Sequence, residues 1–227
     1  MGRVANKVAL VTGVANPVAA ASGRALLREG ARVVLTDADP AAAEAALRDM
    51  GASAADGLAL GKAVADEDAW EQTVARAAAA FGRLDILVNG PPRIVGKTID
   101  DMTLDDLRSL EEHNIVEPWL GMKHVIPTMR GQGGGAIINL SLALARAGAP
   151  GLAGNCTTAA GVRVMSQAAA IECGQHSDGI RVNSVLLSHD GPVANDEVAS
   201  AVVYLASDEA RFMTAGEIVI DDGFLAS

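Results

Sequence analysis

The sequence is poor in aromatic residues and in cysteine. Only 3% of its 227 residues are aromatic, and Tyr204 is the one tyrosine. Cys156 and Cys173 are too few for a disulfide framework and belong to no CxxC or Cys/His cluster, so we expect no metal site. Ala, Val, Leu and Ile must therefore fill the core, which a chain of this length builds without disulfide or metal staples.

The chain also lacks long apolar runs and basic clusters. No run approaches the ~20 residues that span a bilayer, and the first residues lack the apolar region of a signal peptide. The formal charge is −10 with no Lys/Arg run, which argues against a nucleic-acid or anionic-membrane partner. We therefore expect one cytoplasmic domain over residues 1–227.

Short β-branched runs alternate with longer Ala-rich stretches of helical spacing. Strands are expected at 7–12, 31–36, 58–64, 84–89, 136–140, 180–186 and 217–220. Helices are expected at 18–29, 40–50, 67–81, 104–129, 156–174 and 196–206. This order predicts an α/β fold: a Rossmann-type, doubly wound parallel sheet of about seven strands with helices on both faces.

Local signals predict several helix ends. Asp39 and Pro40 suit an N-cap and a first helical residue, respectively. Gly30, Gly51 and Gly82 stand where helices should end, because glycine readily adopts the left-handed conformation that closes a helix.

Ligands of such sheets bind at the carboxyl ends of the strands. Gly13 follows the first expected strand, and Asp37 closes the second at the spacing of an acid that binds a ribose 2′-OH. From residue 4 onward the chain resembles the short-chain dehydrogenase/reductase family. Five segments carry the resemblance in order: KVALVTG (7–13), LDILVN (84–89), IIN (137–139), IRVNS (180–184) and LASDE (205–209). It implies the predicted fold and hydride transfer between NAD(P) and an alcohol or carbonyl.

The positions that the resemblance assigns to the cofactor depart from the family pattern. Pro17 and Ala19 replace two glycines of the TGxxxGxG loop, so an N–H is lost and a methyl group is added where the backbone approaches the pyrophosphate. Ala63 replaces the acid after the third strand, and Pro91 interrupts the NNAG motif. We expect no cofactor in this chain. The retained, vestigial positions are Gly13, Asp37 and Asn89. Each also has a purely structural interpretation: a tight turn, an N-cap and a strand-end bridge, respectively.

The resemblance places the catalytic Ser, Tyr and Lys at Leu142, Asn155 and Ala159. A leucine donates no hydrogen bond, an amide has no titratable proton in the working range, and a methyl group carries no charge. Asn114 matches a retained family asparagine, but without the lysine a helix bend or a core polar contact is its simpler role. No member of the catalytic set is intact, and Tyr204 lies in a late helix far from the tyrosine position.

Other chemistry finds little support in the sequence. Cys156 stands at an expected helix start, where a thiol pKa can fall, but a small apolar filler is the simpler interpretation. His189 and Asp190 lack a third member for a triad. They lie in the segment 188–195, which is short for the substrate-covering loop of the family. The remaining histidines lack metal-ligand spacing: His113, His124 and His176.

The substitutions concentrate at ligand-facing positions, while the strand pattern and helix caps remain. We therefore expect a pseudoenzyme: a non-catalytic subunit of a hetero-oligomeric, NAD-dependent dehydrogenase. Its partner would be an active paralogue that holds NAD(H), paired through helices near 104–129 and 156–174, with a tetramer expected. The resemblance offers a precedent in the hydroxyacyl-CoA dehydrogenase of anaerobic toluene degradation. The alternatives are a homo-oligomeric protein that binds a ligand or catalyses a non-redox reaction, and an alcohol or hydroxysteroid dehydrogenase.

Overall fold

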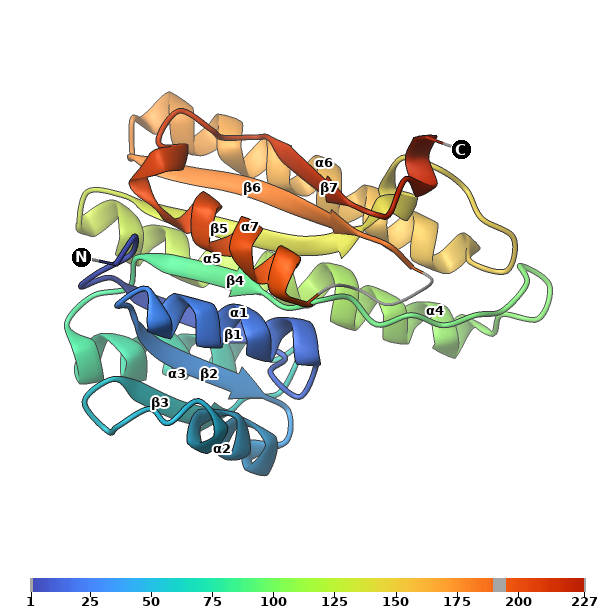
Figure 1. The fold of residues 1–227 in the computed structure, drawn as a ribbon. Helices are drawn as coiled ribbons and strands as arrows, with labels where there is room; N and C mark the ends of the chain where they lie inside the picture. The colour runs from blue at the N-terminus through green and yellow to red at the C-terminus, as the bar shows by residue number, and fades with distance from the viewer. Residues whose placement is uncertain (1, 190–194, 227) are drawn as a thin grey trace.

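The computed structural model describes residues 2–189 and 195–226 (Figure 1). A parallel sheet of seven strands forms its centre, in the order β3-β2-β1-β4-β5-β6-β7. The strands are β1 (Val8–Thr12), β2 (Arg32–Asp37), β3 (Gly57–Gly61), β4 (Ile86–Asn89), β5 (Gly135–Leu142), β6 (Ile180–Leu187) and β7 (Glu217–Ile220). This arrangement confirms the predicted Rossmann-type fold.

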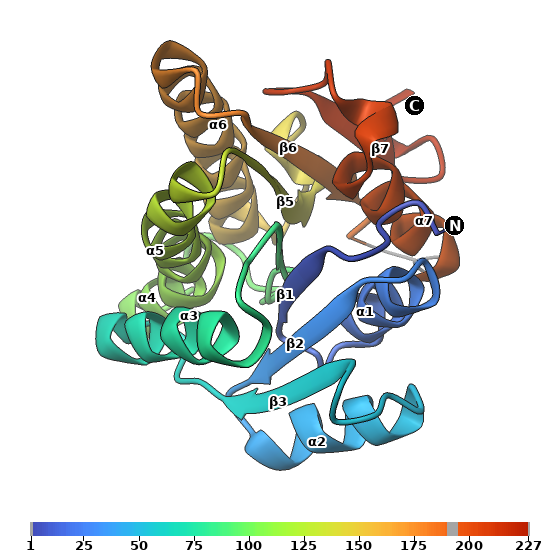
Figure 2. The ribbon, with the colours of Figure 1, turned by 90° about the vertical axis from the view of Figure 1, so that its left-hand side faces the viewer.

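Helices cover both faces of the sheet (Figure 2). One face carries α1 (Pro17–Arg28), α2 (Pro40–Asp49) and α7 (Asn195–Ala206), and the other carries α3 (Glu67–Phe81), α4 (Leu104–Glu111), α5 (Glu117–Gly131) and α6 (Ala153–His176). Strand side chains alternate between the faces, so β1 places Ala9 in one apolar cluster and Leu10 in the other. Each face therefore has its own core.

The predicted helix ends agree with the structure. Asp39 accepts a hydrogen bond from the Ala41 N–H, and Pro40 is the first residue of α2. Gly30, Gly51 and Gly82 follow the ends of α1, α2 and α3 with φ values of 88°, 68° and 77°.

The helix expected over 104–129 is wrong as a single element. A π-helical turn, Glu112–Val116, separates α4 from α5. Pro118 has no N–H to donate to the carbonyl of residue 114, so the regular α-helical ladder is interrupted here. Buried Asn114 lies in this turn, which directs its side chain away from the helix axis and toward the segment after β4.

All strands point the same way, so their carboxyl ends form one edge of the sheet and their amino ends the other (Figure 1). We call these the carboxyl edge and the amino edge. The predicted short loop at 188–195 joins β6 to α7, and residues 190–194 of it lie outside the described residues. In the part of the chain that the structure describes, every helix is too short or too polar to cross a membrane.

Candidate functional site

A cavity of about 260 Å³ opens at the carboxyl edge. Four predicted positions line it: Gly13, Asp37, Asn89 and Pro91. Its wall does not include Pro17, Ala19 or Ala63, nor the four positions near the expected catalytic centre, Asn114, Leu142, Asn155 and Ala159. The structure thus assembles the vestigial cofactor residues around one small space and keeps the expected catalytic positions outside it.

Backbone N–H groups of the loop after β1 donate hydrogen bonds to side chains of the protein itself. Gly13 turns the chain with a φ of +68°, a conformation that favours glycine. The Ala15 N–H then donates to the Asp37 carboxylate at 2.8 Å, and the Val18 N–H donates to the Asn16 side chain at 2.9 Å. Pro17, the first residue of α1, has no N–H. The amides of residues 15 and 18 are therefore already bonded, and residue 17 has none to offer a phosphate.

Asp37 bridges two loops. Its carboxylate also accepts from the Asp39 N–H at 3.1 Å, while Asp39 itself caps α2. The N-cap role considered for Asp37 is therefore wrong. Ala19 is fully buried in the apolar cluster between the sheet and α7, so its methyl group packs in the core.

Asn89 belongs to a buried polar chain. Its amide nitrogen donates to the Asn139 side chain at 2.6 Å, and Asn139 donates to the Ser166 hydroxyl at 2.7 Å. These bonds join β4, β5 and α6. All three residues are at most 2% exposed. Their buried hydrogen bonds therefore fix the carboxyl ends of β4 and β5 relative to α6.

The positions matching the catalytic serine and lysine lie in an apolar cluster. Leu142 ends β5 with 2% of its surface exposed, and Ala159 in α6 is 3% exposed. Both pack with buried Leu144, and with half-buried Leu152 and Phe224. The cluster offers neither a hydrogen-bond donor for a developing alkoxide nor a charge for tuning a neighbouring group.

Asn155, at the tyrosine position, is fully buried and bonded to backbone. Its amide nitrogen donates to the Arg93 carbonyl at 3.2 Å, and its oxygen accepts from the Val95 N–H at 3.3 Å. Asn114 bonds the same segment, since it accepts from the Arg93 N–H and donates to the Arg93 carbonyl, each at 2.9 Å. It also donates to Thr158 on α6 at 3.1 Å. The two asparagines together fasten residues 93–95 against α6.

A buried ion pair beside the cavity was missed in the sequence. Lys62 follows β3, and its side chain is 1% exposed. Its ammonium lies 2.9 Å from the Glu117 carboxylate and 4.2 Å from the Trp70 ring centroid. Glu117 lines the cavity with Arg93 and His113. A lysine within an otherwise apolar run was the available signal, because a buried ammonium requires a partner.

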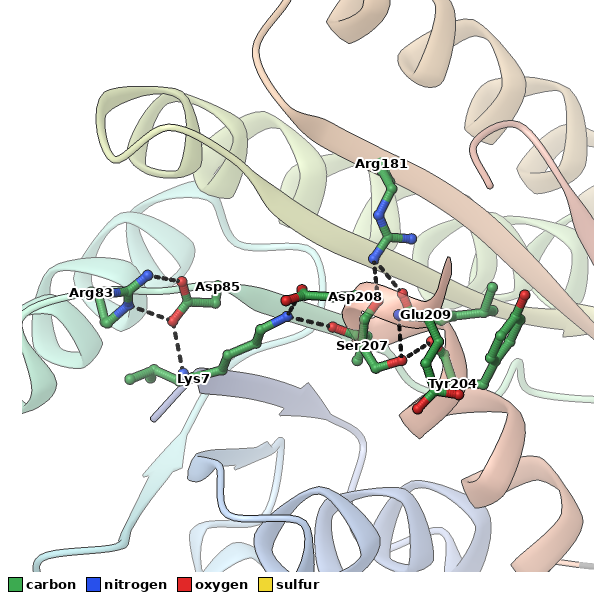
Figure 3. Close-up of polar contacts among 11 residues, drawn as sticks. Lys7, Arg83, Asp85, Arg181, Tyr204, Ser207, Asp208 and Glu209 are labelled. Carbon is green, nitrogen blue, oxygen red and sulfur yellow. Dashed lines mark hydrogen bonds and ion pairs between the residues drawn. The ribbon is translucent and has the colours of Figure 1, made fainter. Parts of the chain in front are cut away.

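The other sequence candidates serve packing or lie apart. The Cys156 thiol donates to the Ala147 carbonyl at 3.7 Å and packs against the apolar cluster. His189 contacts the Phe224 ring at a centroid distance of 4.7 Å, and Asp190 lies outside the described residues. Tyr204 belongs to the last turns of α7, near the amino edge (Figure 3). Among the described residues, His, Cys, Asp and Glu side chains form no group that could hold a metal ion.

The fold is of the Rossmann type, and this cavity lies at the carboxyl ends of the strands, where proteins of this fold bind ligands. The family model "short chain dehydrogenase" matches residues 7–193, so the chain belongs to the short-chain dehydrogenase/reductase family. A solved family structure from Burkholderia xenovorans superposes with a TM-score of 0.91 at 31% identity, covering 100% of this chain and 99% of that one.

Two curated relatives are named as dehydrogenases. The 3-alpha-(or 20-beta)-hydroxysteroid dehydrogenase of Mycobacterium tuberculosis is 34% identical over 99% of this chain and 92% of the relative. The 2,5-dichloro-2,5-cyclohexadiene-1,4-diol dehydrogenase of Sphingobium indicum is 30% identical over 98% of this chain and 97% of the relative. The chain is thus similar along almost its whole length to proteins named as dehydrogenases.

Proposed function

We propose that this chain is a non-catalytic member of its family and serves as the supporting subunit of a heteromeric, NAD-dependent dehydrogenase. The observation that carries the proposal is the packing at the expected catalytic centre. Leu142 and Ala159 are buried in an apolar cluster, and both polar ends of the Asn155 amide are bonded to the segment 93–95. Proton transfer by a positioned side chain contributes roughly 10²–10⁴ in rate, and none of these three side chains transfers a proton.

The residues at the carboxyl edge do not fit a nicotinamide dinucleotide. The Ala15 and Val18 amides donate within the protein, and the Asp37 carboxylate accepts from two backbone N–H groups. The cavity of about 260 Å³ is also smaller than the roughly 300–1,000 Å³ typical of sites for drug-sized ligands. We therefore assign NAD(H) to the partner.

Exposed apolar side chains support the proposed docking surface. Leu104, Trp119, Val164 and Ile171 are 47–59% exposed on α4, α5 and α6. These helices include most of the two stretches expected to pair with an active paralogue, and a protein partner would remove such apolar side chains from water. The free thiols of Cys156 and Cys173 fit the cytoplasmic location that the proposal includes. By analogy, the substrate of the complex is a hydroxyacyl thioester.

The names of the relatives favour a different function, an NAD-dependent dehydrogenase of cyclic alcohols or hydroxysteroids. The 34% identity to a hydroxysteroid dehydrogenase is the observation behind this second candidate. It requires that a dinucleotide displace the internal bonds of Ala15 and Asp37, and that a group other than Asn155 transfer the proton. A homo-oligomeric ligand-binding protein is the third candidate, with the small cavity as its site.

Native mass spectrometry of the protein from its own cells tests the subunit role. We expect a mixed oligomer whose second chain carries intact Ser, Tyr and Lys, and homo-oligomers alone would contradict the proposal. Calorimetric titration of the isolated chain with NAD⁺ and NADP⁺ tests the cofactor assignment. We expect no binding, whereas micromolar affinity together with turnover of cyclopentanol or a hydroxysteroid would establish the dehydrogenase function instead.

A further inference from the structure

A second cavity, of about 460 Å³, opens at the amino edge, opposite the candidate site. β5 runs from one edge to the other, and at ~3.3 Å per residue the two ends of its eight residues lie roughly 23 Å apart. The charged side chains that line the cavity lie at or just before the starts of β1, β4 and β6 and in the turn after α7: Lys7, Arg83, Asp85, Asp178, Arg181, Asp208 and Arg211. Figure 3 shows Lys7 and Arg181 pointing toward the turn that carries Asp208, with the Arg83–Asp85 pair on the other side of Lys7.

Positive charge exceeds negative charge in this cavity. Lys7 pairs with Asp208 at 2.8 Å, and Arg83 pairs with Asp85 at 2.5 Å. Asp178, the remaining acid of the wall, pairs with Arg130 at 2.8 Å. Arg181 and Arg211 form no ion pair among the described residues, and the acid that acts on both, Asp208, already pairs with Lys7. The cavity therefore holds two cations in excess. The excess is notable in a chain with a formal charge of −10.

Arg181 is a half-buried cation with donors to spare. Its guanidinium donates to the backbone carbonyls of Leu205, Ser207 and Met213 at 2.6–3.3 Å. A guanidinium has five N–H donors, so two remain beyond these three bonds. Burial also lowers the pKa of Arg181, although an arginine stays charged at neutral pH. A charge that has lost part of its hydration gains from a bound anion.

Arg211 contributes an exposed and adjustable cation to the same wall. Its guanidinium carbon lies 4.9 Å from the Phe212 ring centroid, and no ion pair holds it within the part of the chain that the structure describes. Asp208 is 89% exposed in its side chain and is the one carboxylate on this turn that lines the cavity. Lys7, Arg181 and Arg211 therefore face a single acid, where a second anion would complete the charge balance.

We propose that the amino-edge cavity binds a small dianion, either phosphate or a phosphate monoester. Two unpaired guanidinium groups match two negative charges, and arginine forms strong paired hydrogen bonds to phosphate oxygens. The cavity volume leaves room for a small carbon skeleton beside the phosphate. This site is remote from the carboxyl edge, so it does not depend on whether the chain is catalytic.

Calorimetric titration of the full chain with inorganic phosphate, in chloride buffer at constant ionic strength, tests this site. Arg211→Gln should weaken phosphate binding by about tenfold, because it removes one charge-assisted contact. Asp208→Asn should tighten binding by about threefold, since it removes a nearby negative charge. Arg211 and Asp208 are exposed, so both variants should fold. A parallel titration with glycerol 3-phosphate distinguishes a free phosphate from an ester.

The control is Arg76→Gln, which changes the net charge equally at an exposed position on α3 that lines neither cavity. It should bind phosphate as the unmodified chain does. Two results would overturn the site: phosphate binding no tighter than chloride binding, or equal weakening by Arg211→Gln and Arg76→Gln. The second result would mean that the anion senses only the overall charge.

Discussion

At the carboxyl edge the polar side chains bond to the protein's own backbone, whereas at the amino edge two arginines form no ion pair among the described residues. Asp37, Asn114 and Asn155 each hold backbone N–H or carbonyl groups of neighbouring segments. Arg181 and Arg211 instead face a cavity of about 460 Å³. The side chains at the expected catalytic centre are thus bonded internally, whereas the amino edge holds two guanidinium groups that no ion pair occupies.

The difference shows that the fold does not depend on the family's catalytic side chains. The strand pairing and the two core clusters do not use the family's catalytic side chains. Replacing a polar catalytic group by an apolar one, as at Leu142 and Ala159, even enlarges the buried apolar surface. An asparagine at position 155 adds two hydrogen bonds to a loop. The residues at these three positions are therefore compatible with a stable fold.

The largest effect is expected from restoring the family's lysine. Ala159→Lys would place an ammonium in the apolar cluster with Leu142 and Leu144, whose described members include no carboxylate. It should cost about 3–5 kcal/mol of unfolding free energy. Ala159→Met, of similar length but uncharged, should cost about 1–3 kcal/mol through overpacking alone. Urea unfolding of the two variants measures the difference. If Ala159→Lys lowers the unfolding free energy no more than Ala159→Met does, position 159 is open to water and the apolar packing at the expected catalytic centre is not tight.

The fold could be predicted almost completely from the sequence, because its determinants are local. Apolar runs of four to eight residues, the Asp39 cap and the glycines after helices are each visible within a few positions. The π-helical turn at 112–116 was not predicted. It depends on Pro118 and on the contact between Asn114 and Arg93, which are 21 residues apart in the chain.

The site could be predicted only as a set of substitutions. Family resemblance located Leu142, Asn155 and Ala159, but what these residues do instead depends on packing between distant segments. Asn155 bonds a loop about 60 residues earlier, and Lys62 pairs with Glu117 across 55 positions. Such pairings follow from the tertiary fold, and no local pattern indicates them.

A smaller effect is expected from removing the loop contact of Asn155. Asn155→Ala would leave the Val95 N–H without its bond and create a small cavity, for a loss of about 2 kcal/mol in unfolding free energy. Thr157→Ala, on the exposed side of the same helix turn, should stay within about 0.5 kcal/mol of the unmodified chain. Equal unfolding free energies of the two variants would show that the contact of Asn155 with residues 93–95 does not stabilise the fold at the carboxyl edge.

The smallest effect is expected for the pH dependence of stability that Asp208 causes at the amino edge. The hydrogen bond from Lys7, reinforced by Arg181 and Arg211, lowers the pKa of Asp208, so its ionised form stabilises the folded state. That stabilisation is present above the unfolded pKa of about 4 and is lost as the pH falls through the folded value. Asp208→Asn should therefore lower Tm by about 1–2 °C at pH 6 and by less at pH 3, measured by circular dichroism without phosphate. The control is Asp49→Asn, at an exposed carboxyl without an ion pair among the described residues; its Tm difference from the unmodified chain should not change between pH 6 and pH 3. For Asp208→Asn, a Tm difference that stays constant between these two pH values would contradict the charge arrangement proposed for this edge.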